Sequence, residues 1–429
     1  MDSSQALLQR RNQVMGAGAP LFYDPPLHIV RGDGAYLFDA QGRRYVDMYN
    51  NVPVVGHANP RVVEALSRQA ATLNVHSRYL HEGVVAFAER LVSLHGPGIE
   101  AVIYSCTGTE ASEVALRMAR FATGRRGIVC SNATYHGNSE LVGSLTHLVN
   151  TPQDPKGEIQ AFPYPEKYRP LEPGLSEGEL CELYLRRLDD AIGRCEASGA
   201  GFAALIVCPI FANEGLPEIP AGFMARAAER VRKAGGLLIA DEVQSGYGRT
   251  GKWWGYEAAG FQPDIVVMGK PMGNGLPLAA TAASRDLVEG FRARTRYFNT
   301  FAANPVQAAV GMAVLDEIED RRLLSHVAGV GAELKAALVR RQTENPWIGD
   351  VRGEGLFLGI EIVEPGELRR PALSAARRLT NLMKERGFLT SNAGAFGNVV
   401  KIRPPLVFSG SDAAAFLQAW DAEMAGFNG

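Results

Sequence analysis

The sequence predicts an α/β protein in which helices cover both faces of a mostly parallel central sheet, with a smaller α+β domain attached. Two short apolar runs are the first observation: residues 237–240 lead into Asp241, and residues 265–269 lead into Lys270. Each run is bounded by turn residues, which is typical of a buried parallel strand, and the interval leaves room for one crossover. The second observation is a change of rhythm near residue 325, after which helical and strand patterns alternate in a compact unit.

Bulk composition excludes several classes of protein. The 429 residues are 46% hydrophobic and 21% charged, with a net charge of −2 and no long basic run, so we expect no nucleic-acid partner. No apolar stretch of about 18 residues occurs, which predicts no membrane span. The chain starts without an apolar signal core, and its five cysteines are scattered, which favours a reducing cytoplasm. Eight dispersed histidines indicate no metal site.

The N-terminal part begins with strand-like alternation. Residues 27–50 alternate apolar and polar side chains around glycine-containing turns, which predicts a hairpin. Residues 61–73 and 84–94 then have apolar side chains at helical spacing. The expected division has three parts: residues 1–60 packing with the small domain, residues 61–324 as the large domain, and residues 325–429 as the small C-terminal domain.

A strand followed by a helix forms the first candidate anion site. Residues 101–105 are strand-like, and Thr-Gly-Thr then opens a helix that Thr109 can cap. The expected inner face of this helix is Ala111, Val114, Ala115 and Met118. Backbone N–H groups at a helix start favour phosphate, and Gly108 lets the backbone approach closely. An ordinary cap and turn is the alternative.

Further strands are expected over residues 127–130, 202–208 and 278–284, where short apolar runs recur. Residues 151–178 are rich in proline, glycine and charge, so we interpret them as a surface excursion. We therefore expect the strands of the central sheet to come from the chain both before and after residues 151–178.

Asp241 and Lys270 follow two neighbouring strands and should face one crevice, because ligands of open α/β sheets bind at the carboxyl ends of the strands. A buried salt bridge is one interpretation of this pair. The other is pyridoxal phosphate (PLP) chemistry, in which lysine forms a Schiff base and a carboxylate keeps the pyridine nitrogen protonated.

Two longer segments favour the second interpretation. DEVQSGYGRTG (241–251) and GKPMGNGLP (269–277) resemble the aspartate and Schiff-base segments of the class III, or ω-amino acid, aminotransferases, and the resemblance covers nearly the whole chain. It implies the aspartate aminotransferase fold, PLP as cofactor, and a homodimer. It also implies cofactor contacts: Gly108 and Thr109 on the phosphate, Tyr135 and Val243 on opposite faces of the ring, His136 beside Tyr135, Gln244 near the ring hydroxyl, and Thr300 on the phosphate in the partner subunit. For Val243 the alternative is plain core, and for His136 it is a polar loop residue or support of a neighbouring group.

The substrate residues are Arg403, Glu214, Tyr23 and Arg78. Alternation in 399–403 places Val399, Lys401 and Arg403 on one face of a strand. The resemblance implies that Arg403 binds a substrate carboxylate. Its planar guanidinium group can donate two hydrogen bonds to a carboxylate or a phosphate; a surface arginine is the alternative. Glu214 is carried over although residues 210–214 replace the Glu-Pro turn usual in the family.

The favoured reaction is transfer of an amino group from a primary amine or amino acid to a 2-oxo acid. NNVPVVGH (50–57) and LNVHSRYLHE (73–82), however, resemble a subgroup that includes ethanolamine-phosphate and phosphohydroxylysine phospho-lyases. Elimination of phosphate and ammonia is therefore the alternative, and Tyr23, Arg78 and Arg403 could each serve a phosphate. A non-catalytic PLP-fold module is disfavoured because both Asp241 and Lys270 are present.

Overall fold

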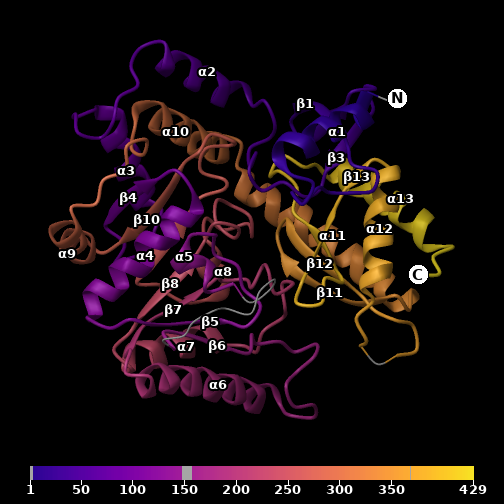
Figure 1. Cartoon of the computed structure of the whole chain (residues 1–429). Coiled ribbons are helices and arrows are strands. Elements are labelled where there is room, and N and C mark those ends of the chain that lie inside the picture. The colour runs from indigo at the N-terminus through magenta and orange to yellow at the C-terminus, as the bar shows by residue number, and fades with distance from the viewer. Residues whose placement is uncertain (1–2, 147–156, 368) are drawn as a thin grey trace.

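The computed structural model describes residues 3–146, 157–367 and 369–429. Figure 1 shows a large body built around the central sheet and a smaller body that carries both ends of the chain. Within the described ranges, no helix is long and apolar enough to cross a membrane.

The central sheet has seven strands, six of them parallel. In spatial order they are β4 (Ala101–Ser105), β10 (Ala279–Ala283), β9 (Ile265–Met268), β8 (Leu237–Asp241), β7 (Phe202–Val207), β5 (Gly127–Ser131) and β6 (Ile159–Phe162). Only β10 runs antiparallel to its neighbours, β4 and β9. The strands before Asp241 and Lys270 are adjacent and parallel, which confirms the predicted α/β fold.

Helices cover both faces of this sheet. One face carries α4 (Gly108–Thr123), α5 (Glu140–Gly143) and α9 (Arg285–Thr295). The other carries α3 (Glu82–Ser93), α6 (Glu177–Ala197), α7 (Phe223–Lys233) and α10 (Pro305–Asp320). Alternation along β8 divides the core: Leu238 and Ala240 pack on the second face and Ile239 on the first. Helix α2 (Pro60–Ala70) packs on α10, and the short α8 (Gly255–Ala259) lies between β8 and β9 in the chain.

The smaller body holds two four-stranded sheets. One contains β11 (Ile348–Glu354), β12 (Phe357–Ile362), β15 (Val399–Ile402) and β14 (Ser391–Ala393). The other contains β1 (Ile29–Asp33), β2 (Tyr36–Asp39), β3 (Arg44–Asp47) and β13 (Phe388–Leu389). The helices of this body are α1 (Ser3–Met15), α11 (Leu323–Glu344), α12 (Leu373–Glu385) and α13 (Gly410–Met424). Because β3 pairs with β13, N-terminal strands join a C-terminal one; the boundaries at residues 60 and 324 stay a prediction.

Three local expectations were wrong. Residues 27–50 form three strands rather than one hairpin. The expected surface excursion contains the edge strand β6, which pairs with β5, while residues 151–156 lie outside the described ranges. Helix α4 is capped by Thr107, whose hydroxyl accepts from Glu110 N, so Thr109 lies inside the helix. Both positions are threonine, and only the backbone conformation distinguishes the cap.

Candidate active site

Asp241 ends β8, and Lys270 follows β9 by two residues, so adjacent parallel strands bring the two to one edge of the sheet. The Asp241 carboxylate is buried and held on both oxygens. Oδ2 lies 2.6 Å from His136 Nδ1, and Oδ1 accepts from Val243 N at 3.0 Å. His136 is buried and its Nε2 lies 2.8 Å from the Thr134 hydroxyl. His136 therefore orients the carboxylate, in the supporting position considered for it.

Lys270 makes no hydrogen bond or ion pair with any residue that the structure describes. Many protein atoms surround the Lys270 amine, but part of the residue's surface is exposed to solvent. Burial lowers the pKa of the Lys270 amine, and the charge of Arg403 lowers it further. A lowered pKa favours the neutral amine, which is the nucleophilic form needed to join a carbonyl.

The start of α4 offers free N–H donors beside these two residues. The N–H groups of Gly108 and Thr109 donate to no acceptor in the described part of the chain. Gly108 leaves little room for a side chain, since a Cβ there would lie 3.1 Å from Val243 Cγ2. The Thr109 hydroxyl donates to Asn138 Oδ1 at 3.1 Å. These donors at a helix N-terminus fit a phosphate.

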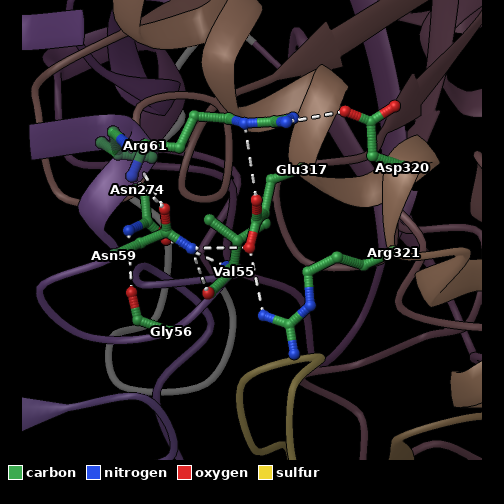
Figure 2. A network of polar contacts seen from close by, with 9 residues as sticks. Val55, Gly56, Asn59, Arg61, Asn274, Glu317, Asp320 and Arg321 are labelled. Carbon is green, nitrogen blue, oxygen red and sulfur yellow. Dashed lines mark hydrogen bonds and ion pairs between the residues drawn. The ribbon is translucent and has the colours of Figure 1, made fainter. Parts of the chain in front are cut away.

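The turn after Lys270 is held by hydrogen bonds to a loop in the N-terminal part of the chain (Figure 2). Asn274 Oδ1 accepts from Val55 N at 3.0 Å, and its Nδ2 donates to Gly56 O at 2.9 Å. Asn59 holds the same loop by donating to Val55 O, at 3.1 Å, and to Glu317 on α10, at 3.0 Å. The position of the lysine turn thus depends on residues 55–59.

Arg403 is buried just after β15, with two of its three nitrogens engaged. Nε donates to Tyr49 O at 3.0 Å, and Nη1 donates to Gln244 Oε1. Its guanidinium lies over the Tyr49 and Phe357 rings, at 5.0 and 5.4 Å from their centroids. Within the described residues, Nη2 has no hydrogen-bond partner, so it can still donate to an anion.

Lys401 precedes Arg403 by two residues and lies on the same face of the strand. It is a second cation, and the sequence analysis did not select it as a site residue. It is 6% exposed and has no carboxylate partner among the described residues. Burial lowers the pKa of its amine to about 7, and the charges of Arg403 and Lys270 contribute to that decrease. The expected alternation could have identified it, because it places Lys401 on the same face of the strand as Arg403, opposite Val400 and Ile402, which belong to the main core cluster.

Glu214 does not neutralise these cations by contact. Its Oε1 accepts from the Ser131 hydroxyl, and its Oε2 is buried without a hydrogen-bond partner. Burial raises the pKa of the Glu214 carboxyl, which favours its neutral form. Among the described residues, no carboxylate contacts Lys401 or Arg403, although the charge of Glu214 raises the pKa of Lys401.

Of the remaining expected substrate residues, Tyr23 lies near Tyr49 and Arg78 lies apart from the site. The Tyr23 hydroxyl donates to Thr390 O at 2.7 Å, and burial raises its pKa. The Arg78 guanidinium lies 4.1 Å from the centroid of the Phe298 ring. Phe298 precedes the exposed Thr300 by two residues. No contact recorded for the described residues joins Arg78 or Thr300 to Asp241 or Lys270.

Two asparagines complete the site and were missed by the sequence analysis. Asn51 Nδ2 donates to the carbonyls of Val243 and Gln244, at 3.3 and 3.2 Å. Asn213 joins Gln244 to the backbone carbonyl of Tyr135, a residue that is 41% exposed. Asn51 lies in the NNVPVVGH segment, which was a signal for it; Asn213 had none.

A lysine with a lowered pKa, an oriented carboxylate and a free helix N-terminus on one parallel sheet fit PLP, and they define a PLP-dependent enzyme. The model of the family "Aminotransferase class-III" matches residues 21–422. The chain belongs to this family, whose members use PLP and typically act on small amines.

Individual relatives are named for different activities, among them amino transfer and phosphate elimination. The chain is 38% identical to alanine–glyoxylate aminotransferase 2 homolog 2, mitochondrial, of Arabidopsis thaliana, over 98% of this chain and 88% of that protein. It is 33% identical to ethanolamine-phosphate phospho-lyase homolog 1 of Caenorhabditis elegans, over 98% and 93%. Among solved structures, a phospholyase from Arthrobacter in complex with phosphoethanolamine superimposes with a TM-score of 0.95, at 40% identity, over 98% of this chain and all of that one.

Proposed function

We propose that this enzyme eliminates phosphate and ammonia from a small phosphorylated amino alcohol. The observation that carries the proposal is the pair of buried cations on one face of β15, Lys401 and Arg403, with no carboxylate in contact with either in the described residues. A phosphate monoester carries close to two negative charges at neutral pH, and it matches two cations better than a carboxylate does. The 40% identity with the Arthrobacter phospholyase supports the same substrate class.

The roles proposed for the core residues follow from their positions. PLP, when bound, supplies an electron sink for the carbon that bears the amine. Lys270 removes the proton from that carbon, and the lowered pKa of its amine favours the neutral form that can act as a base. Asp241, oriented by His136, pairs with the pyridine nitrogen. The phosphate of the substrate then leaves from the neighbouring carbon while Arg403 holds it, and water releases ammonia and a carbonyl product.

The other cofactor contacts are proposals of the same kind. Gly108 and Thr109 receive the cofactor phosphate, and Tyr135 and Val243 enclose its ring, with Gln244 beside the ring hydroxyl. Glu214 and Tyr23 shape the substrate side; neither contacts Arg403.

A homodimer is part of the proposal. Arg78 and Thr300 lie on neighbouring exposed segments, where His76 packs edge-on to Phe298 at 6.1 Å between centroids. Tyr79, Leu80 and Phe301 on these segments are 65%, 100% and 74% exposed. An apolar surface of this kind favours contact with a second subunit, which would deliver Thr300 and Arg78 to the partner's site. The cytoplasmic location stays a prediction, since the Arabidopsis relative is named as mitochondrial.

Amino transfer to a 2-oxo acid is the second candidate. The identity with the Arabidopsis aminotransferase homolog favours it. Arg403 alone would suit a substrate carboxylate, but this function gives Lys401 no partner.

The test is incubation of the holoenzyme with ethanolamine phosphate and no 2-oxo acid. We expect inorganic phosphate and ammonia to accumulate in equal amounts over many turnovers while the cofactor absorbance returns to its starting spectrum. A single equivalent of product, with the absorbance changed until pyruvate is added, would instead establish the aminotransferase.

A further inference from the structure

Asn213, in the loop after β7, joins three parts of the site through one residue. Its Nδ2 donates to Tyr135 O at 3.0 Å, and its Oδ1 accepts from Gln244 Nε2 at 2.9 Å. Its backbone carbonyl accepts from Gly394 N, in the smaller body, at 3.2 Å. The Asn213 side chain therefore links Gln244, three residues after Asp241, to Tyr135 in the loop that follows β5.

The direction of each hydrogen bond is determined by Arg403 at one end and by a carbonyl at the other. A guanidinium only donates, so Gln244 must present its oxygen to Arg403 Nη1. Its amide nitrogen then faces Asn213, which must present an oxygen there. The Asn213 nitrogen is left for Tyr135 O, which only accepts. Three hydrogen bonds thus form a row that runs from Arg403 through Gln244 and Asn213 to the Tyr135 carbonyl, and each joins a donor to an acceptor.

This row controls which nitrogen of Arg403 remains for a ligand. Tyr49 O takes Nε and Gln244 takes Nη1, which leaves Nη2. Among the described residues, the side chain of Gln244 has only two hydrogen-bond partners, Arg403 and Asn213. Without Asn213, the Gln244 amide is free to rotate, and Arg403 would lose one of the two hydrogen bonds that hold its guanidinium plane.

We propose that Asn213 is a positioning residue for anion binding: by holding the Gln244 amide, it keeps Arg403 Nη2 directed at the anionic group of the substrate. The inference rests on the proposed function only in that Arg403 receives that anion. Asn213 itself touches neither the substrate nor the cofactor in this scheme.

The test compares Asn213→Ala with Asn213→Asp in the holoenzyme. The probe is ethyl phosphate, a phosphate monoester that has no amine, titrated by calorimetry. We expect Asn213→Ala to raise the Kd of ethyl phosphate and the KM of ethanolamine phosphate about tenfold, with kcat changed less than about threefold. Asn213→Asp keeps an oxygen for Gln244 Nε2, but its second oxygen faces Tyr135 O and it adds a negative charge, so it should weaken ethyl phosphate binding at least as much as Asn213→Ala does.

A double-mutant cycle separates positioning from general damage. Gln244→Ala should weaken ethyl phosphate binding as Asn213→Ala does, and the double variant should be no weaker than either, because both changes interrupt one row. Wild-type constants in Asn213→Ala, or additive losses in the double variant, would overturn the inference. A wild-type enzyme that binds ethyl phosphate but releases no phosphate from ethanolamine phosphate overturns only the proposed function; one that binds no ethyl phosphate overturns both.

Discussion

Replacement of Lys401 by methionine should abolish the pH dependence of phosphate binding. The ordinary pKa of a lysine is 10.5, and burial together with Arg403 lowers that of Lys401 to about 7. At about 1.36 kcal/mol per pKa unit, this corresponds to about 5 kcal/mol at most. Lys401 is only 6% exposed, so solvent screens little of this energy.

The sign follows from where the proton binds. The unfolded chain keeps Lys401 protonated up to pH 10.5, whereas the folded protein releases that proton above about pH 7. The charged amine therefore destabilises the fold fully below pH 7, and the free energy of unfolding rises from pH 7 to 10.5. A bound dianion favours the protonated amine again, so ligand binding above pH 7 must take up a proton.

Ethyl phosphate titrations from pH 7 to 9 provide the assay, because a phosphate monoester is already dianionic above its second pKa of about 6. We expect the Kd of the wild-type holoenzyme to rise up to about tenfold per pH unit. Calorimetry in two buffers of different ionisation enthalpy should register uptake of close to one proton. Lys401→Met should remove the slope and the uptake, and Lys401→Arg, which stays charged, should bind with little change to pH 9.

A matched control is Lys233→Met, since Lys233 is exposed at the end of α7. It should retain the wild-type slope. An equal slope and proton uptake in Lys401→Met would refute the assignment of Lys401 to the substrate phosphate.

Three further predictions concern the cofactor side. Lys270→Ala should reduce kcat by about 10²–10⁴-fold or more, since proton transfer by a positioned group contributes that much, and unchanged single-turnover rates would contradict this. His136→Phe removes a buried hydrogen bond to Asp241 and should destabilise the folded protein by about 1.5–3 kcal/mol; urea unfolding measures it, and an unchanged midpoint would count against the role of His136. Gly108→Ala places a Cβ 3.1 Å from Val243 Cγ2, so the Kd of PLP, measured by fluorescence titration of the apoenzyme, should rise about tenfold or more. Addition of Val243→Ala should recover part of that loss, and no recovery would mean that crowding at this contact is not the cause.

The sequence by itself predicted the α/β fold, the cofactor and the meeting of Asp241 with Lys270. Short apolar runs define buried strands, and parallel neighbours place their carboxyl ends at one edge, so two polar residues after such runs must approach each other. The apolar face of α4 was predicted for the same reason: Ala111, Val114 and Met118 are all buried because helical periodicity is a local property.

Only the tertiary structure decided the surroundings of those residues. Glu214 accepts a hydrogen bond from Ser131, and Asn213 connects Gln244 to Tyr135. These partners come from segments far apart in the chain, and their pairing depends on how loops pack rather than on any local pattern. The charge state of Lys401 is a further example, because its pKa is set by burial and by neighbouring cations that no stretch of sequence displays.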